Sequence, residues 1–205
     1  MRLLPSGTTA LLVELDGLDE VLALYAAVVD DPPAGVLDVV PAARTLLVVT
    51  DPARTSLSAV AEAVRRTEPR RDRLGSGELV EIPCRYDGED LEEAAELVGC
   101  DGGELVERHT STEWTVAFCG FAPGFGYLTA AGWEWEVPRR SSPRKRVPPG
   151  SVALAGEFTG VYPRESPGGW QLIGRTDLAV FDLARDPPAL LRPGVRVRFT
   201  DVGGS

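Results

Sequence analysis

Residues 143–176 constrain the fold of this chain more than any other stretch, because proline and glycine interrupt them throughout. The stretch holds five prolines and six glycines among short apolar runs such as Val-Ala-Leu and Trp-Gln-Leu-Ile. Proline fixes φ and glycine allows backbone conformations closed to other residues, so this density predicts tight turns between short strands. A flexible linker would lack the apolar runs.

Composition limits the class of protein. The chain has 205 residues, of which 43% are apolar and 25% charged, as expected for one large or two small globular domains. No apolar run is long enough for a membrane span, and no signal-peptide region follows Met1 and Arg2, so we expect a cytoplasmic protein. Cys84, Cys100 and Cys119 form no Cys-x-x-Cys pair, so no metal site is expected.

Charge is distributed unevenly along the chain. The net charge is −10, divided into −4 over residues 1–78, −11 over 79–138 and +5 over 139–205. An acidic chain is a poor partner for nucleic acid, whose phosphates require clustered cations. The local basic cluster consists of Arg139, Arg140, Arg144, Lys145 and Arg146. It could bind a small anion or an acidic protein face, or it could be a solvated loop.

The first 80 residues alternate between strand and helix patterns. Strands are predicted at residues 8–15, 36–40, 45–50 and 79–84, and helices at 18–29 and from an Asp51 cap to residue 66. The order β-α-β-β-α-β is that of a ferredoxin-like domain, with one sheet face covered by helices and the other free to form an interface. The polar stretch 68–77 predicts a hinge, and we place the first domain at residues 1–80.

Residues 81–205 form the predicted second domain. Two short helices are expected at residues 91–98 and 103–109, followed by strands at 114–121, 152–155, 171–174, 178–182 and 195–199. Short strands separated by turn residues at this spacing are typical of a barrel or sandwich. The fold class predicted for the whole chain is therefore α+β.

Common catalytic motifs are absent from the sequence. His109 is the only histidine, so at most one imidazole base is available, and a structural role for it is an open alternative. Ser151 follows Gly150 but lacks the second glycine of a Gly-x-Ser-x-Gly nucleophile turn. Lys145 is the only lysine, and it lies in no phosphate-binding loop of the Gly-x4-Gly-Lys-Ser/Thr type.

Glycine turns, aromatic residues and arginines carry the remaining functional signal. The turns at 123–126 and 166–169 would let backbone N–H groups approach an anion, and neighbouring rings could wall a small-molecule pocket. Arg144 and Arg175 could bind a carboxylate or phosphate through two parallel hydrogen bonds. The candidate substrate- or anion-binding residues are Pro123, Gly124, Phe125, Tyr127, Ser151, Tyr162, Gly168, Gly169, Trp170 and Gln171. Barrel turns and core packing are the structural alternatives for all of them.

Three long motifs occur in order: GFAPGFGYL, PRRSSPRKRVPPGSVALAG and TGVYPRESPGGWQLIGRT. Through them the chain resembles the allophanate hydrolase subunit 1 family, which includes B subunits of bacterial 5-oxoprolinases and KipI-type kinase inhibitors. This resemblance implies a cyclophilin-like, carboxyltransferase-like β-barrel for the second domain. Where the family usually has Gly-Gln-Thr, this chain has Glu157, Phe158 and Thr159, which puts any role of the amide in doubt.

The resemblance also implies a function. It points to one subunit of an ATP-dependent hydrolase that opens 5-oxoproline to glutamate, inactive alone. The expected partners are a subunit 2 (C)-like chain and possibly an A subunit, with ATP used by the complex. His109, Arg144 and Arg175 are the catalytic candidates, with Tyr127 and Tyr162 positioning a small amide substrate.

Two other functions stay open from the sequence. One is a carboxyltransferase-like subunit of allophanate or urea metabolism, and biotin would be the cofactor only in that case. The other is a regulatory module that inhibits a sensor histidine kinase by binding it. A stable subunit 2-like partner would favour a hydrolase, and inhibition of kinase autophosphorylation would favour the module.

Overall fold

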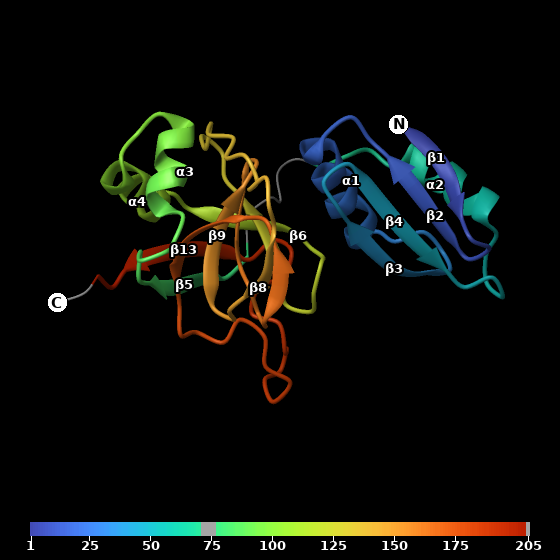
Figure 1. The fold of residues 1–205 in the computed structure, drawn as a ribbon. Helices are drawn as coiled ribbons and strands as arrows, with labels where there is room; N and C mark the ends of the chain where they lie inside the picture. The colour runs from blue at the N-terminus through green and yellow to red at the C-terminus, as the bar shows by residue number, and fades with distance from the viewer. Residues whose placement is uncertain (71–76, 204–205) are drawn as a thin grey trace. The chain divides into compact units, whose positions relative to one another are not determined.

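The computed structural model describes residues 1–70 and 77–203. The chain folds into two compact units, Met1–Leu74 and Gly75–Ser205 (Figure 1). Most of the predicted hinge at 68–77 lies outside the described residues. Because the units are separate, each has its own core.

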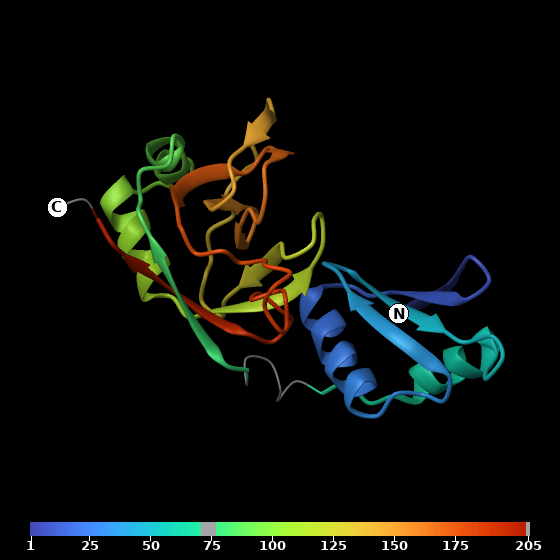
Figure 2. The same cartoon turned by 90° about the horizontal axis from the view of Figure 1, so that it is seen from below.

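The first unit is a four-stranded antiparallel sheet with two helices on one face (Figure 2). Its elements are β1 (Arg2–Ser6), β2 (Ala10–Glu14), α1 (Leu18–Asp30), β3 (Val36–Pro41), β4 (Thr45–Thr50) and α2 (Leu57–Arg66). The strand order is β1-β2-β4-β3. Alternate residues of β2 and β4, such as Val13 and Val48, are fully buried against helix residues such as Val28 and Val64.

The predicted ferredoxin-like arrangement of this unit is wrong in its strands. Strand β5 (Leu79–Cys84) forms as predicted, but it pairs in parallel with β13 (Arg196–Asp201) in the second unit. The fourth strand of the first sheet is instead β1, which pairs antiparallel with β2. The element order is therefore β-β-α-β-β-α. Strand patterning alone indicates that residues 79–84 are extended but does not indicate which sheet they join.

The two helices also differ in detail from the prediction. Helix α2 begins at Leu57 and not after Asp51, because the Ser56 hydroxyl accepts a hydrogen bond from Ala59 N at 3.2 Å. Asp51 instead closes a local turn, accepting from Ala53 N at 2.9 Å. The helix is therefore capped by Ser56, and not by Asp51 with Pro52 as the first helical residue.

The second unit is a seven-stranded sheet that closes almost completely into a barrel, consistent with the predicted cyclophilin-like fold (Figure 1). Its further elements are α3 (Leu91–Val98), α4 (Gly102–Ser111), β6 (Trp114–Cys119), β7 (Gly126–Thr129), β8 (Arg144–Val147), β9 (Ser151–Ala155), β10 (Phe158–Val161), β11 (Ser166–Gly168) and β12 (Gln171–Arg175). The order is β12-β9-β10-β7-β6-β13-β5, and β8 and β11 form a separate two-stranded antiparallel sheet. Arg85 and Arg175 exchange backbone hydrogen bonds of 2.8 and 2.9 Å, which link the two edges.

One predicted strand of this unit does not form. Residues 178–182 contribute only an isolated bridge between Phe181 and Ala189. Strands β7, β8, β10 and β11, each three or four residues long, are too short for a periodic pattern to indicate.

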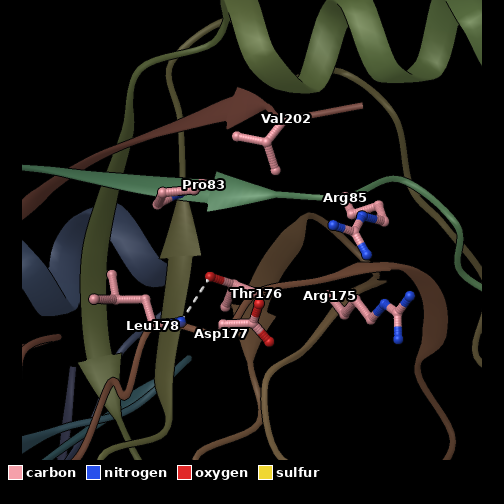
Figure 3. A pocket seen from close by; sticks show the side chains of 7 residues that line it. All are labelled: Pro83, Arg85, Arg175, Thr176, Asp177, Leu178 and Val202. Carbon is pink, nitrogen blue, oxygen red and sulfur yellow. Dashed lines mark hydrogen bonds between the residues drawn. The ribbon is translucent and has the colours of Figure 1, made fainter. Parts of the chain in front are cut away.

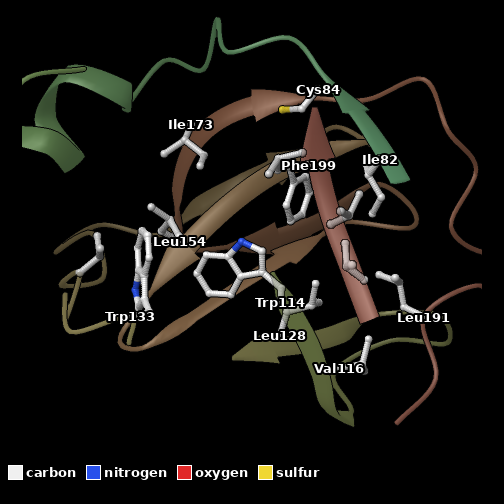
Figure 4. Packing of buried hydrophobic residues seen from close by; sticks show 14 of the residues in the cluster. Ile82, Cys84, Trp114, Val116, Leu128, Trp133, Leu154, Ile173, Leu191 and Phe199 are labelled. Carbon is white, nitrogen blue, oxygen red and sulfur yellow. The ribbon is translucent and has the colours of Figure 1, made fainter. Parts of the chain in front are cut away.

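The barrel unit packs apolar side chains on both faces of β9. Val152 and Leu154 join the main cluster, in which Trp114 and Phe199 are surrounded by strands (Figure 4). Ala153, on the opposite face, packs with the aromatic residues of a second cluster. A strand buried on both faces shows no alternation of apolar and polar residues, which explains the continuous apolar run at residues 152–155.

Helices α3 and α4 pack against the main cluster through small and apolar residues, including Ala94 and Leu105. Asp101 caps α4 by accepting a hydrogen bond from Glu104 N at 2.9 Å. Over the described ranges, none of the helices combines the length and the apolar character needed to cross a membrane.

Candidate functional site

A buried carboxylate organises the arginines of the second unit. Asp90 has a side chain that is 2% exposed, and it accepts hydrogen bonds from Arg140 Nη1 at 2.5 Å and Arg144 Nη2 at 2.7 Å. Its other oxygen accepts from Leu172 N at 2.7 Å. Arg144 also pairs with the exposed Glu89 at 3.1 Å. The basic loop of residues 139–146 is thus held by the acidic segment that precedes α3.

The pKa of Asp90 follows from these contacts. Burial raises it, but the hydrogen bonds from Arg144 and Leu172 N, with the charges of Arg144 and Arg140, lower it more, so the net direction is downward. The same hydrogen bond to Asp90 raises the pKa of Arg144. The carboxylate therefore stays charged at neutral pH and fixes two guanidinium groups.

Three buried polar atoms in and next to this cluster have no hydrogen-bond partner within residues 1–70 and 77–203. They are Arg140 Nε, Arg144 Nη1 and Gln171 Oε1. Buried polar groups are normally hydrogen-bonded, so unused donors and an unused acceptor at one place make this cluster a candidate binding site. The cluster offers N–H donors from two cations and one amide oxygen.

An aromatic cluster centred on Phe125 lies next to these arginines. Phe125 is 1% exposed and makes edge-to-face contacts with Tyr127, Tyr162 and Trp170 at centroid distances of 5.1, 5.2 and 5.3 Å. Tyr127 is partly exposed, and burial raises its pKa. Burial also raises the pKa of Tyr162 to about 12, so both phenols remain protonated and can donate.

The segment at residues 166–169, which is strand β11 and the glycine after it, joins the two clusters. Gly169 O accepts from Arg140 N at 2.8 Å, and Gly168 pairs with Arg144 in the β8–β11 ladder. A Cβ at Gly168 would overlap the Tyr162 hydroxyl, so glycine is needed for this close approach. The guanidinium of Arg139 lies 6.0 Å from the ring centroid of Trp170. Aromatic rings and cations therefore border the same segment.

The loop before β7 has an unusual backbone. Phe121 has φ of 64°, a left-handed value that is costly for a non-glycine residue, and its ring is 56% exposed. Gly124 has φ of 81°, and a Cβ there would overlap Phe181. Pro123 lies between them and is exposed. Backbone strain and an exposed ring next to Phe125 are typical of a binding loop.

The departure from the family's Gly-Gln-Thr pattern adds a ring to the aromatic cluster. Phe158 lies edge-to-face against Tyr127 at 5.7 Å and against Phe118 at 5.6 Å. An amide at position 158 would place polar atoms next to Tyr127, whereas phenylalanine buries that side of the ring. Thr159 hydrogen-bonds within the core.

His109 lies in the core of the barrel unit and not among these arginines. Its ring is fully buried, with Nδ1 2.7 Å from Tyr86 Oη and Nε2 2.9 Å from Thr159 Oγ1. Thr159 donates to Ala153 O at 3.2 Å, so Nε2–H donates to Thr159 and Nδ1 accepts from Tyr86. Burial lowers the pKa of His109 to about 3. A neutral histidine with both nitrogens bound favours a structural role.

Ser151 is also bound internally. Its hydroxyl donates to Pro148 O at 2.9 Å, and the side chain is buried. No hydrogen bond joins Ser151 to His109 in the described part of the chain. The geometry supplies no serine–histidine pair.

Arg175 lies apart from Arg144. Arg175 pairs with Asp87 at 2.7 Å, whereas Arg144 pairs with Asp90 at the other end of the same acidic segment. Arg175 lines a pocket of about 310 Å³ whose lining is Pro83, Arg85, Arg175, Thr176, Asp177, Leu178 and Val202 (Figure 3). The catalytic candidates His109, Arg144 and Arg175 thus occupy three different places.

The structure brings together most of the candidate binding residues and adds others. The residues that meet around strand β11 and the glycine after it are Phe125, Tyr127, Tyr162, Gly168, Gly169, Trp170, Gln171 and Arg144. Sequence reasoning missed Asp90 and Arg85. An acidic run just before a helix is normally read as favourable helix-end electrostatics, and only the fold turns Asp90 toward the basic loop.

Comparison with known proteins places the chain in a family. Residues 1–191 match the family described as "Carboxyltransferase domain, subdomain C and D". The chain belongs to this carboxyltransferase-domain family. The match runs through both units, so the first sheet as well as the barrel is part of the family's fold.

Two curated proteins are similar to this chain over more than four fifths of their own length. The chain is 39% identical over 203 residues to the 5-oxoprolinase B subunit of Escherichia coli O157:H7, covering 94% of this chain and 92% of that protein. It is 38% identical over 204 residues to the 5-oxoprolinase B subunit of Bacillus subtilis strain 168, covering 92% and 84%. The crystal structure of the protein TTHA0988 superposes with a TM-score of 0.77 at 38% identity over 96% of this chain. The chain spans 40% of that structure's length.

Proposed function

We propose that this protein is the B subunit of an ATP-dependent 5-oxoprolinase, which opens the lactam of 5-oxoproline to give glutamate. The observation that carries the proposal is the similarity, over more than nine tenths of the chain, to two proteins named as B subunits of 5-oxoprolinase. Those names favour the lactam reaction over the urea-derived and kinase-inhibitor alternatives.

The reaction requires activation of a stable amide. Transfer of the γ-phosphoryl group of ATP to the lactam oxygen makes the ring carbon susceptible to water. One water adds to that carbon and the ring C–N bond breaks, which frees the amine and leaves an acyl phosphate. A second water then hydrolyses the acyl phosphate to the carboxylate of glutamate and inorganic phosphate. Negative charge gathers on oxygen atoms throughout, so positioned cations and N–H donors lower the barrier.

We place this anion-stabilising role on the arginine cluster around Asp90. Arg140 Nε and Arg144 Nη1 are buried donors without a partner in the described residues, and Asp90 fixes both side chains. Arg139, at the rim near Trp170, adds an exposed cation. Tyr127 is partly exposed beside Trp170, so its hydroxyl can add a further donor.

The chain is expected to be inactive alone. Its sequence has no phosphate-binding loop, and the described residues hold no serine–histidine pair, so the complete site requires residues from partners. We propose a subunit 2 (C)-like chain, and an A subunit, as those partners, with ATP used by the assembled complex.

The test is reconstitution. The tagged chain is co-expressed with the C-like and A-like chains of its own host, and 5-oxoproline-dependent ADP release is measured with and without this chain. Release that requires all components supports the proposal, and a stable complex with no 5-oxoproline-dependent turnover contradicts it.

A variant then tests the site. Arg139→Gln should lower turnover at least ten-fold, since one charge-assisted hydrogen bond is worth about 1.5–3 kcal/mol. Arg146→Gln is the matched control, because Arg146 lies in the same basic loop but is 76% exposed and paired with Glu165. Equal activity of the two variants would remove the assignment.

A further inference from the structure

The pocket beside Arg175 is separate from the arginine cluster. Gln171 and Arg175 are the first and last residues of β12, and four residue steps along a strand span roughly 13 Å. Arg175 pairs with Asp87, whereas Arg144 pairs with Asp90. The pocket therefore has its own charges.

Two arginines are placed side by side at this pocket by the closure of the barrel. Arg85 and Arg175 exchange both backbone hydrogen bonds, so they are a directly opposed antiparallel pair whose side chains emerge on the same face. Both guanidinium groups are visible at the same side of the pocket in Figure 3. Like charges directly opposite each other are destabilising.

Only one of these charges is compensated within the described residues. Arg175 pairs with Asp87 at 2.7 Å, and both side chains are largely exposed. The guanidinium of Arg85 has no hydrogen-bond or ion-pair partner in residues 1–70 and 77–203. A carboxylate between the two arginines would relieve the repulsion and use the free guanidinium.

The rest of the lining restricts what can accompany that carboxylate. Asp177 adds a negative charge to the pocket lining. Its carboxylate repels a ligand with two negative charges but can accept a hydrogen bond from an N–H group of the ligand. Pro83, Leu178 and Val202 supply apolar surface between these polar ends. At about 310 Å³ the pocket lies at the lower end of the range for ligand sites.

We propose that this pocket, a second site separate from the arginine cluster, binds a small carboxylate that also carries an N–H group, the class to which 5-oxoproline and glutamate belong. The carboxylate lies between Arg85 and Arg175, the N–H group donates to Asp177, and the short carbon skeleton contacts Leu178 and Val202. The choice of these two ligands rests on the proposed function, whereas the carboxylate–N–H requirement rests on the pocket.

The test is an NMR titration of the full chain with four probes. 5-Oxoproline and L-glutamate carry both groups, glutarate lacks the nitrogen, and 2-pyrrolidinone lacks the carboxylate. We expect the first two to bind at least ten-fold more tightly than the others, with chemical-shift changes at residues 175–178. No binding by either of the first two, or equal binding of glutarate and L-glutamate, would overturn the proposal.

Variants locate the ligand. Arg85→Gln should weaken binding of 5-oxoproline or glutamate about ten-fold or more, and Asp177→Asn should remove the preference for L-glutamate over glutarate. Arg65→Gln, an equal charge change on the exposed face of α2, should alter neither. Both pocket residues are exposed, so folding should be retained. Loss of binding in Arg139→Gln without loss in Arg85→Gln would place the ligand at the arginine cluster and refute the pocket.

ADP release by the reconstituted complex separates this inference from the proposed function. A complex active on 5-oxoproline whose turnover and ligand binding are unchanged by Arg85→Gln would refute the pocket and leave the function standing. An inactive complex in which this chain still binds L-glutamate through Arg85 would refute the function and leave the pocket standing.

Discussion

Replacing Asp90 with Asn tests whether one buried carboxylate holds the basic loop. The substitution keeps the shape of the side chain but removes its charge. An amide has one oxygen, so it cannot accept from Leu172 N on one side and from Arg140 and Arg144 on the other. One of the two interactions must be lost.

The magnitude follows from the burial of the partners. Breaking a fully buried ion pair costs about 3–5 kcal/mol. The side chain of Asp90 is 2% exposed, but those of Arg140 and Arg144 are 28% and 17% exposed. Water can therefore solvate the two guanidinium groups when the ion pairs are lost, which reduces the cost. We expect the free energy of unfolding to fall by about 3 kcal/mol, at the low end of the range.

Glu89→Gln provides the matched control. Glu89 pairs with the same Arg144 at 3.1 Å, but its side chain is 78% exposed, so its removal should cost less than about 1 kcal/mol. Urea unfolding followed by tryptophan fluorescence reports both values, because the barrel unit contains all four tryptophans. Equal losses in the two variants would refute the argument that burial gives Asp90 its importance.

The acid dependence gives a second measurement of the same carboxylate. The pKa of Asp90 is lowered on folding, so its contribution is present above the unfolded pKa of about 3.9 and is lost as pH falls through the lower folded value. The wild-type protein should therefore lose stability below about pH 4 more steeply than Asp90→Asn. Parallel acid profiles would show that the folded environment does not favour the charged form.

Three further predictions concern other residues. The pKa of His109 is lowered to about 3, so wild-type stability should fall from about pH 6.5 downward by up to about 1.4 kcal/mol per pH unit, and His109→Gln should flatten this slope in urea unfolding. Gly124→Ala should lower the unfolding free energy by about 2 kcal/mol in the same assay, because φ is 81° and the new Cβ overlaps Phe181. Burial raises the pKa of Cys84 to about 12 and of Cys119 to about 11, so mass spectrometry should find both thiols unmodified by iodoacetamide at pH 8 until the chain is unfolded.

Local patterns predicted the elements more successfully than their pairing. The strand at 79–84 and the helix at 91–98 lie where the sequence placed them. The partner of β5 is β13, more than one hundred residues later, and no local pattern encodes that register. Strand β1 was missed because Arg2–Ser6 is short and carries Pro5, which edge strands tolerate.

The candidate site shows the same division. Glycine and aromatic residues beside turns suggested either a pocket wall or core packing for Phe125, Tyr162 and Trp170. These rings pack against one another and are buried, and their role in binding stays a prediction. Asp90 could not be recognised from the sequence, since acidic residues are common at the N-termini of helices. The role of His109 could not be predicted, because the sequence does not show whether a single histidine is buried or exposed. Its contacts with Tyr86 and Thr159 in the structure favour a structural role.

The uneven charge of the sequence has a structural explanation that narrows the search for ligands. The acidic residues Asp87, Glu89 and Asp90 pair with arginines from the basic C-terminal part, so much of the segregated charge is neutralised within the barrel unit. The basic run in sequence is therefore only partly a basic surface, because Asp90 holds Arg140 and Arg144. Two exposed arginines without an ion-pair partner in the described residues lie where we propose that an anion binds: Arg139 at the aromatic rim, and Arg85 at the pocket. Because these two cations lie at different places, separate substitutions can assign one anion to each.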